Sequence, residues 1–339
     1  MTALPADFSH LFRMSDDTGL LEHARGAVPR REHGYCLDDV ARGLVLLARE
    51  GDPTTSQVRL ADVYLAFVAH AQDSSGSFRN RLAYDRRWMD LPGTGDWWGR
   101  AVWSLGSVAT GAGPGWQRAE ALDRFSLGCR QRSRWLRSMS YATLGAAQVV
   151  TMLPDHEGAR RVLVDFVERI GPPTDGVCPW PEDRLSYANA RIPDALLAAG
   201  AALGDSEVVR HGSHLLDWLV GVQTVDGHLT PVPAGGSPVA SVRSGFDQQP
   251  IEVAAIADAA ARASALSGEV RWRGTLATAA AWFEGANDVG AAMHDPATGG
   301  GYDGLTVTGP NANQGAESTI AWLLTSQLAS TVGCERPSP

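Results

Sequence analysis

The chain has few cysteines, little positive charge and no long apolar run, and each shortage excludes a class of protein. Cys36, Cys129, Cys178 and Cys334 are scattered among 339 residues without a CxxC pair, so we predict neither a zinc motif nor a disulfide framework. A net charge of −9 argues against a nucleic-acid partner, which would require a basic surface. Because no stretch reaches the roughly 20 apolar residues that span a bilayer, we also expect no membrane partner.

Sequence signals for targeting and for several enzyme classes are missing as well. The N-terminal residues MTALPADFSHLFRMSDD contain no basic region followed by an apolar one, which favours a cytoplasmic protein without a signal peptide. The glycines at 299–301 lack the Lys-Ser/Thr of a phosphate-binding loop, and the GxSxG of serine hydrolases is absent. His211 and His214 have no evident third ligand. We therefore expect neither a metal nor a cofactor.

Strand patterns are rare, and helical segments of two kinds alternate along the chain. The first kind is rich in small residues and apolar nearly all round, which predicts burial. The second kind is amphipathic, which predicts one face toward solvent. The buried kind comprises residues 35–48, 96–109, 139–152, 186–203, 249–266 and 313–329. The amphipathic kind comprises residues 58–72, 116–132, 158–171, 207–223 and 271–287.

Corresponding points near the starts of the buried helices recur about every 40 to 65 residues, which indicates a repeat built from helix pairs. The last buried helix has no amphipathic helix after it, and the N-terminal LPADFSHLFRM can supply one. We therefore predict an all-α fold, an (α/α)6 barrel in which six inner and six outer helices form a toroid. It would occupy residues 1–330 as one domain, followed by a disordered tail at 331–339. An open helical solenoid is the alternative.

Polar side chains gather at the N-terminal end of each buried helix, whereas the other ends are apolar. If the inner helices all run the same way, these groups converge on one mouth, where free N–H groups and helix dipoles favour carboxylates and polar ligands. The adjacent Asp38 and Asp39 point about 100° apart, so we expect one to cap or pair with Arg42 and the other to face the cavity. Asp96 and Arg100 have the spacing of a salt bridge at a helix start.

Carboxyl groups at such a mouth suit glycoside hydrolysis, which requires two of them beside the scissile bond. The sequence predicts Asp39, supported by Asp38, and Glu317 as the acid/base pair, with Asp96 in reserve, because their helices are neighbours in a closed ring. Glu252 either lies at the mouth or pairs with an arginine such as Arg243. The residues expected to bind the sugar are Trp97, Trp98, Arg100, Tyr141, Glu182, Tyr187, Asn189, Arg191, Gln249, Glu252 and Gln314. Helix capping, core packing and ordinary salt bridges are the structural alternatives for each of them.

Several motifs together resemble a poorly characterised bacterial (α/α)6 domain that is similar to the six-hairpin glycosidase superfamily. They are MSDDTGLLEHARGAVPRREHGYCLDDVARGL, GDWWGRAVWSLG, WPEDRLSYANARIPDALLAAG and NANQGAESTIAWLL, and the resemblance covers about residues 14–330. It implies a toroid with carbohydrate chemistry, and a glycosyltransferase or a β-mannoside phosphorylase as a pathway partner. The group has Asn after the paired aspartates and Asp before the Asn of the fourth buried helix, where this chain has Val40 and Ala188.

The leading functional hypothesis is a cofactor-independent glycoside hydrolase that acts on an oligosaccharide or small glycoside. A sugar epimerase or isomerase on the same fold is the second hypothesis. Such enzymes move a carbon-bound proton with a histidine or lysine near the mouth, and His33 is the candidate beside the motifs. A third hypothesis is a non-catalytic carbohydrate-binding accessory of a glycosyltransferase, which would use the aromatic wall without the acids.

Overall fold

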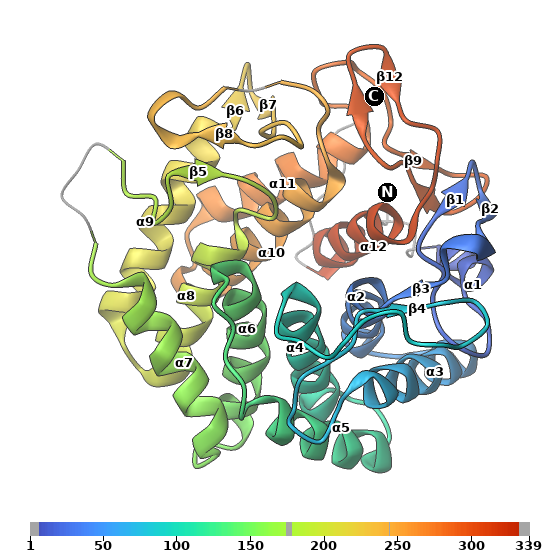
Figure 1. Ribbon diagram of the computed structural model, residues 1–339. Helices are drawn as coiled ribbons and strands as arrows, with labels where there is room; N and C mark the ends of the chain where they lie inside the picture. Colours follow the sequence, from blue (N-terminus) through green and yellow to red (C-terminus); the bar gives the residue numbers. More distant parts are fainter. Residues whose placement is uncertain (1–6, 174–177, 244, 332–339) are drawn as a thin grey trace.

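A computed structural model describes residues 7–173, 178–243 and 245–331, and within these ranges the chain forms two concentric layers of helices (Figure 1). The inner layer comprises α2 (Leu37–Ala48), α4 (Asp96–Thr110), α6 (Leu136–Met152), α8 (Arg191–Leu203), α10 (Pro250–Ser267) and α12 (Ala316–Thr331). The outer layer comprises α1 (Ser9–Met14), α3 (Thr55–Ala71), α5 (Gly115–Gly128), α7 (Glu157–Ile170), α9 (Ser206–Val222) and α11 (Val270–Phe283).

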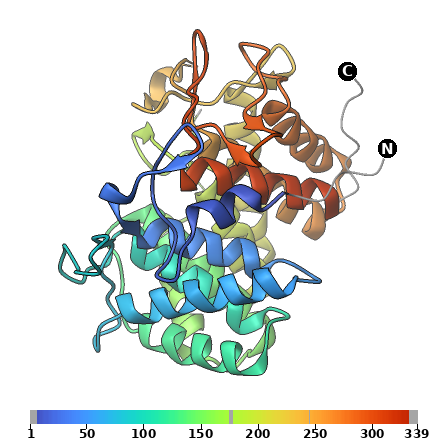
Figure 2. The same cartoon turned by 90° about the vertical axis from the view of Figure 1, so that its right-hand side faces the viewer.

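The inner helices form a closed ring. Each packs against the next in chain order, and α12 packs against α2, so the open solenoid is excluded and the (α/α)6 barrel is confirmed. The N-terminal helix α1 packs against α12, as predicted for the segment that completes the outer layer, and Figure 2 shows this blue helix beside the red one. The tail expected at 331–339 lies outside the described residues apart from Thr331, where α12 ends.

Small residues allow the inner helices to approach closely, most clearly between α4 and α6. A Cβ at Gly99 would lie 2.1 Å from the backbone oxygen of Ser138, and one at Gly106 would lie 2.6 Å from that of Gly145. The core between the two layers is filled by side chains from every helix, including the fully buried Trp98 and Trp282. The small residues that predicted buried helices thus allow the backbones of neighbouring inner helices to touch.

The strands are short and lie in the connections that lead from an outer helix to the next inner helix. All described sheets are antiparallel pairs of two-residue strands. The pairs are β1 (Ala24–Arg25) with β2 (Val28–Pro29), β3 (Tyr35–Cys36) with β4 (Arg81–Leu82), β5 (Arg184–Leu185) with β8 (Ser237–Pro238), β6 (Thr224–Val225) with β7 (His228–Leu229), β9 (His294–Asp295) with β10 (Gly300–Gly301), and β11 (Leu305–Thr306) with β12 (Gly309–Pro310). Two 3-10 turns, Arg31–His33 and Val239–Ser241, lie in the same connections. The long connections therefore surround the end of the barrel at which the inner helices begin.

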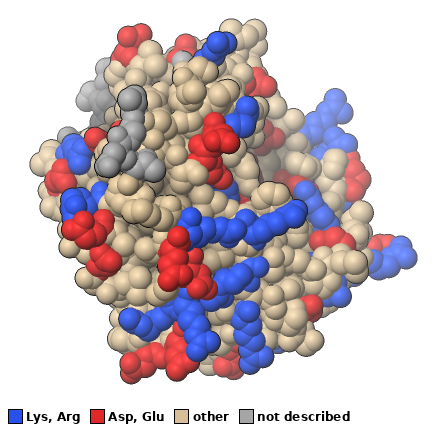
Figure 3. Space-filling view, turned by 60° about the vertical axis from the view of Figure 1, so that its left-hand side comes forward, with Lys and Arg blue, Asp and Glu red and all other residues tan. Residues whose placement is uncertain are grey.

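The surface carries charges of both signs. On the face shown in Figure 3, basic and acidic side chains are intermixed over the helices. Among the described residues, no helix combines the length and the apolar character that crossing a membrane requires.

Candidate functional site

A cavity of about 460 Å³ opens at the end of the barrel where the inner helices begin. Its lining comes from α2, α4, α10 and α12, from the connections that precede them, and from the connection that precedes α8. The predicted site residues that line it are Asp38, Asp39, Arg100, Tyr187, Gln249 and Glu317. The N-terminal ends of these helices therefore meet at one mouth, as predicted.

Beneath the mouth the barrel becomes apolar and narrow. A void of about 20 Å³ lies between aliphatic residues of the inner helices and the predicted Tyr141 and Arg191. The rings of Trp103 and Tyr141 stack there with centroids 6.0 Å apart, and the Arg191 guanidinium lies 4.8 Å from the Trp103 ring centroid. Tyr141 and Arg191 thus line a void that adjoins the cavity, because Arg42, Ile251 and Glu317 line both.

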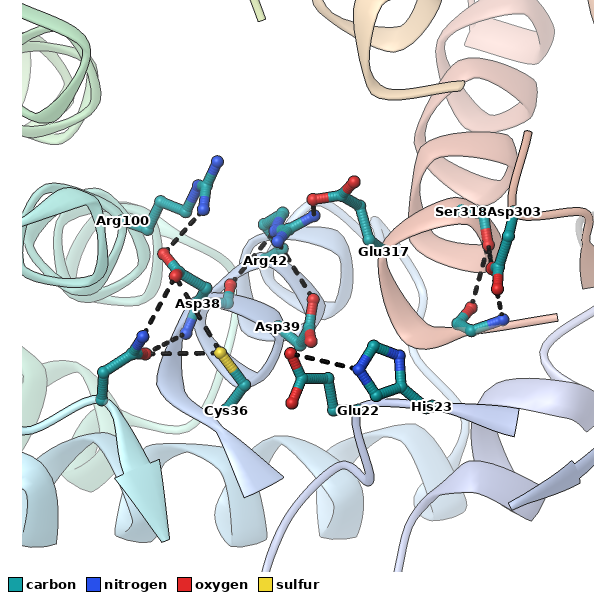
Figure 4. A network of polar contacts seen from close by, with 12 residues as sticks. Glu22, His23, Cys36, Asp38, Asp39, Arg42, Arg100, Asp303, Glu317 and Ser318 are labelled. Atoms are coloured by element: carbon teal, nitrogen blue, oxygen red, sulfur yellow. Dashed lines mark hydrogen bonds and ion pairs between the residues drawn. The ribbon is translucent and has the colours of Figure 1, made fainter. Parts of the chain in front are cut away.

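Arg42 on α2 joins two of the predicted catalytic carboxyl groups (Figure 4). Its guanidinium lies 3.0 Å from a carboxylate oxygen of Asp39 and donates to Glu317 Oε2 at 2.6 Å. Its Nε also donates to the main-chain oxygen of Asp38 at 3.2 Å. One buried arginine therefore holds a carboxyl from α2 and a carboxyl from α12 in the same cavity.

Asp38 pairs with a different arginine from the one expected. Arg100 donates to Asp38 Oδ1 at 2.6 Å and to the Tyr141 hydroxyl at 2.9 Å. The sequence predicts that one aspartate caps or pairs with Arg42 and that the other faces the cavity. In the structure Asp39 pairs with Arg42, Asp38 pairs with Arg100, and both aspartates line the cavity. The expected Asp96–Arg100 bridge is not formed, and Asp96 instead accepts the Tyr187 hydroxyl at 2.5 Å.

The environments of the two bridged carboxyl groups differ. The Asp39 side chain is 5% exposed, and burial raises its pKa to about 7 although Arg42 opposes the shift. The negative charges of Glu317 and Glu22 raise the Asp39 pKa further. The Glu317 side chain is 40% exposed and paired with Arg42. A buried carboxyl group with a raised pKa and a partly exposed carboxyl group thus lie on adjacent inner helices.

One group of side chains at this mouth has ligand atoms of the kinds that bind metal ions. Single atoms of Glu22, Cys36 and Asp39 lie within 4.8 Å of one another. The two carboxyl groups already contact guanidinium groups, Glu22 that of Arg81 and Asp39 that of Arg42. Burial also raises the pKa of the Cys36 thiol well above its usual value. Since arginine supplies the positive charge here, we assign no metal to this cluster.

Both predicted tryptophans lie away from the cavity. Trp98 is fully buried, and its indole N–H donates to the Gly128 carbonyl at the end of α5. The Trp97 indole N–H donates to the Phe78 carbonyl at 2.7 Å, with its ring over the glycine turn that precedes α4. Trp98 belongs to the core and Trp97 packs against it partly buried, and neither ring is among the residues that line the cavity.

Two other predicted sugar ligands hold connections in place. The buried Gln314 side chain accepts from the Thr298 hydroxyl at 2.8 Å and donates to Asp295 at 3.1 Å. Glu182 pairs with the buried Arg137. Both side chains thereby fix connections around the mouth.

Asn189 and Glu252 are buried beneath the rim and bond to each other. The Asn189 side-chain amide donates to Glu252 Oε2 at 2.9 Å, and the Asn189 backbone N–H donates to the same oxygen at 3.3 Å. Asn189 Oδ1 accepts from Arg137 at 2.7 Å. Of the two alternatives predicted for Glu252, the pairing with Arg243 is not formed, since Asn189 donates to this carboxyl group, and Glu252 is not among the residues that line the cavity.

This buried network positions Tyr187 at the cavity. Arg137 Nε donates to the Tyr187 main-chain oxygen at 2.9 Å, while the Tyr187 hydroxyl donates to Asp96 on α4. The next residue, Ala188, has a φ of 46°, a conformation in which Asp and Asn are more common than alanine. The Asp that the resembling group has at this position is therefore explained by the backbone conformation alone, without a catalytic role.

Glu252 is expected to make stability depend on pH. Burial raises its pKa to about 7, so between about pH 4.5 and 7 the folded chain keeps a proton that the unfolded chain releases. The free energy of unfolding contributed by this group therefore falls as the pH rises, by up to about 1.4 kcal/mol per pH unit. A Glu252→Gln variant should lose this slope in denaturant titrations between about pH 5 and 8. The exposed Glu207→Gln is the control, and stability curves that run parallel for wild type and Glu252→Gln would contradict the assignment.

The sequence reasoning did not identify several residues that line the cavity. Glu22, His23, Arg81 and Asp303 all do so, and all come from connections between helices. Glu22 and His23 lie in the TGLLEHARG stretch that carries part of the resemblance, which is the only signal that pointed to them. The other two had no recognisable motif.

Comparisons with known structures support the fold. Neither a protein-family model nor a curated protein matches the sequence. A sugar epimerase from a ruminal bacterium has a TM-score of 0.71 at 12% identity, covering 97% of this chain and 96% of its own. The cellobiose 2-epimerase of Spirochaeta thermophila has a TM-score of 0.68 at 14% identity, with coverage of 96% and 93%. A cellulase of C. cellulolyticum has a TM-score of 0.61 at 8% identity, with coverage of 93% and 87%.

Proposed function

We propose that the protein is a glycoside hydrolase that acts on an oligosaccharide or small glycoside. The observation that supports this most is the Arg42 bridge between Asp39 and Glu317. It holds two carboxyl groups of different exposure inside one cavity, each from a different inner helix. The same fold carries a cellulase among the similar structures, which makes hydrolysis compatible with the barrel.

The two carboxyl groups would divide the chemistry between them. Asp39, with a pKa of about 7, can keep a proton at neutral pH and donate it to the leaving oxygen. Glu317 would activate water or attack the sugar. Because both contact one planar guanidinium, their bonded oxygens lie no more than about 8 Å apart. That limit admits the separation of about 5–5.5 Å found in retaining enzymes and the lower part of the range of about 6.5–9.5 Å found in inverting enzymes.

The rest of the cavity supports a sugar ligand. Tyr187, Gln249 and Arg100 offer hydrogen-bonding groups at the rim, and Ile251 gives the wall an apolar face. Tyr187 is 37% exposed, so its ring can contact a ligand while its hydroxyl remains bonded to Asp96. Mixed polar and aromatic surfaces of this kind suit a ring with many hydroxyl groups.

A sugar epimerase or isomerase is the second candidate, and His23 is the observation that favours it. This imidazole lines the cavity, 3.6 Å from Glu22, and the ring of His33 lies edge-on to it at 4.8 Å. The candidate from the sequence was His33, whereas His23 is the histidine that lines the cavity. The chain contains no lysine, and His23 is the histidine among the described residues that line the cavity, so it is the candidate base for a carbon-bound proton.

Isotope labelling separates these functions. The protein is incubated with a panel of neutral di- and oligosaccharides in D₂O, and the products are examined by mass spectrometry and NMR. Hydrolysis predicts shorter saccharides without deuterium on carbon. An isomer of unchanged length that carries carbon-bound deuterium would instead establish an epimerase or isomerase. Binding without any conversion would support the accessory role and overturn the proposed hydrolysis.

A further inference from the structure

The charged side chains that line the cavity are unequal in number. Carboxyl groups are contributed by Glu22, Asp38, Asp39, Asp303 and Glu317, whereas the arginines among the described lining residues are Arg42, Arg81 and Arg100. With Asp39 protonated as the proposed general acid, four carboxyl groups still face three arginines, so the excess remains acidic around the position at which the proposed substrate would lie. A ligand with its own negative charge would therefore meet like charge.

Each of these arginines is already paired with a carboxyl group of the protein. Arg42 contacts Asp39 and Glu317, and Arg100 contacts Asp38. Arg81 contacts Glu22 at the rim. Recognition of a carboxylate or phosphate usually relies on an arginine fork that is free to donate. Here such a ligand would first have to displace an internal ion pair.

The N-termini of α2 and α12 at the mouth also have carboxyl groups of the protein beside them. A free helix N-terminus is a ready anion site, because its N–H groups and dipole favour negative charge. At the start of α12, Asp303 Oδ1 accepts from the Gly315 backbone N–H at 2.7 Å and from the Ser318 hydroxyl at 2.6 Å. Asp38 and Asp39 lie in the first turn of α2. Figure 4 shows these carboxyl groups on both sides of the Arg42 bridge.

We infer that the cavity selects a neutral sugar and discriminates against uronic acids and sugar phosphates. The inference rests on the proposed function, in which the cavity binds the saccharide to be cleaved. Neutral hydroxyl groups can donate to carboxylate oxygens without disturbing any of the arginine pairs. The same arrangement disfavours inorganic phosphate as the group that attacks the sugar, so water is the acceptor and added phosphate should not raise the rate.

The first test compares matched ligands by calorimetry on the wild-type protein. Methyl glycosides of glucose, mannose and galactose, in both anomers, are compared with the corresponding uronides and 6-phosphates. The neutral member of the best-bound series is expected to bind at least about tenfold more tightly than its charged counterparts, which corresponds to about 1.4 kcal/mol.

The second test removes the carboxylate partner of one cavity arginine, Arg81. A Glu22→Gln variant removes the carboxylate that pairs with Arg81, so affinity for the uronide should increase several-fold relative to the neutral glycoside. Glu207→Gln breaks an exposed pair with Arg210 on α9 and should leave this ratio unchanged. The comparison of ratios distinguishes a change in charge selection from a general change in stability or folding.

The outcomes of these tests separate the inference from the proposed function. A uronide or sugar phosphate that binds as tightly as the neutral sugar overturns the inference even if hydrolysis occurs. So does the absence of binding by every neutral glycoside in the panel. A neutral sugar that is bound selectively but never cleaved overturns the hydrolase and leaves the inference standing.

Discussion

A Glu317→Gln variant is expected to lose about a hundred- to ten-thousandfold in kcat on the glycoside that the protein cleaves. Glutamine preserves the shape of the side chain and can still accept a hydrogen bond from Arg42, but it can neither take up a proton nor attack the sugar. KM should therefore change by only a few-fold, which is the signature of an interaction made in the transition state. Steady-state kinetics on the best substrate of the isotope experiment measure both quantities.

The partner residue provides an independent check of the same assignment. If Asp39 is the general acid, wild-type activity should fall as the pH rises through about 7, because the proton to be donated is lost. Asp39→Asn should abolish most activity at every pH. Glu207→Gln, which removes an exposed carboxylate on α9, should behave as wild type. A Glu317→Gln enzyme with kcat within a few-fold of the wild type would exclude Glu317 from catalysis.

The (α/α)6 barrel could be predicted from the sequence because its inner helices have a distinctive composition. Helices that bury all their faces must be rich in small residues, and Gly99 and Gly106 are now seen at contacts that leave no room for a Cβ. The alternation with amphipathic helices then predicted two layers. Even the closing segment was predicted, because a twelfth helix was needed and the N-terminus offered one.

Only some of the side chains that line the cavity could be predicted from the sequence, and the reason is geometric. An inner helix has one face toward the barrel interior and another toward the outer layer, and both are buried. Composition does not separate them, so Trp98 was assigned to a sugar wall although it packs against α5. Asn189 was assigned to the ligand for the same reason, although its donors and acceptors are used inside the protein.

Residues in the connections were harder still to predict. Glu22 and Asp303 reach the cavity because long irregular segments return across the mouth, and no periodicity describes such a path. Their effect is nevertheless large, since they place two of the carboxyl groups that give the cavity its charge. Predicting them would have required the tertiary contacts that fix each connection.

Arg42 carries the second large prediction, because it holds the fold and the site together. Arg42→Met is expected to lower the free energy of unfolding at about pH 9 by about 3–5 kcal/mol, since it removes one partner from a buried ion pair. Burial raises the pKa of Asp39 to about 7 with Arg42 beside it, so without this arginine the charged form of Asp39 costs still more. The loss should be smaller at about pH 5, where Asp39 holds a proton in both proteins. Chemical denaturation at both pH values measures the effect.

Two further variants show whether this loss comes from the stranded carboxylate. Adding Asp39→Asn to Arg42→Met removes the unpaired carboxyl group and should restore part of the stability at about pH 9, a non-additivity expected of residues in contact. Arg161→Met breaks an exposed pair with Glu157 on α7 and should change stability little. If the double variant is no more stable than Arg42→Met, and the loss is the same at both pH values, then lost packing of the long arginine side chain explains the effect and the ion pair does not.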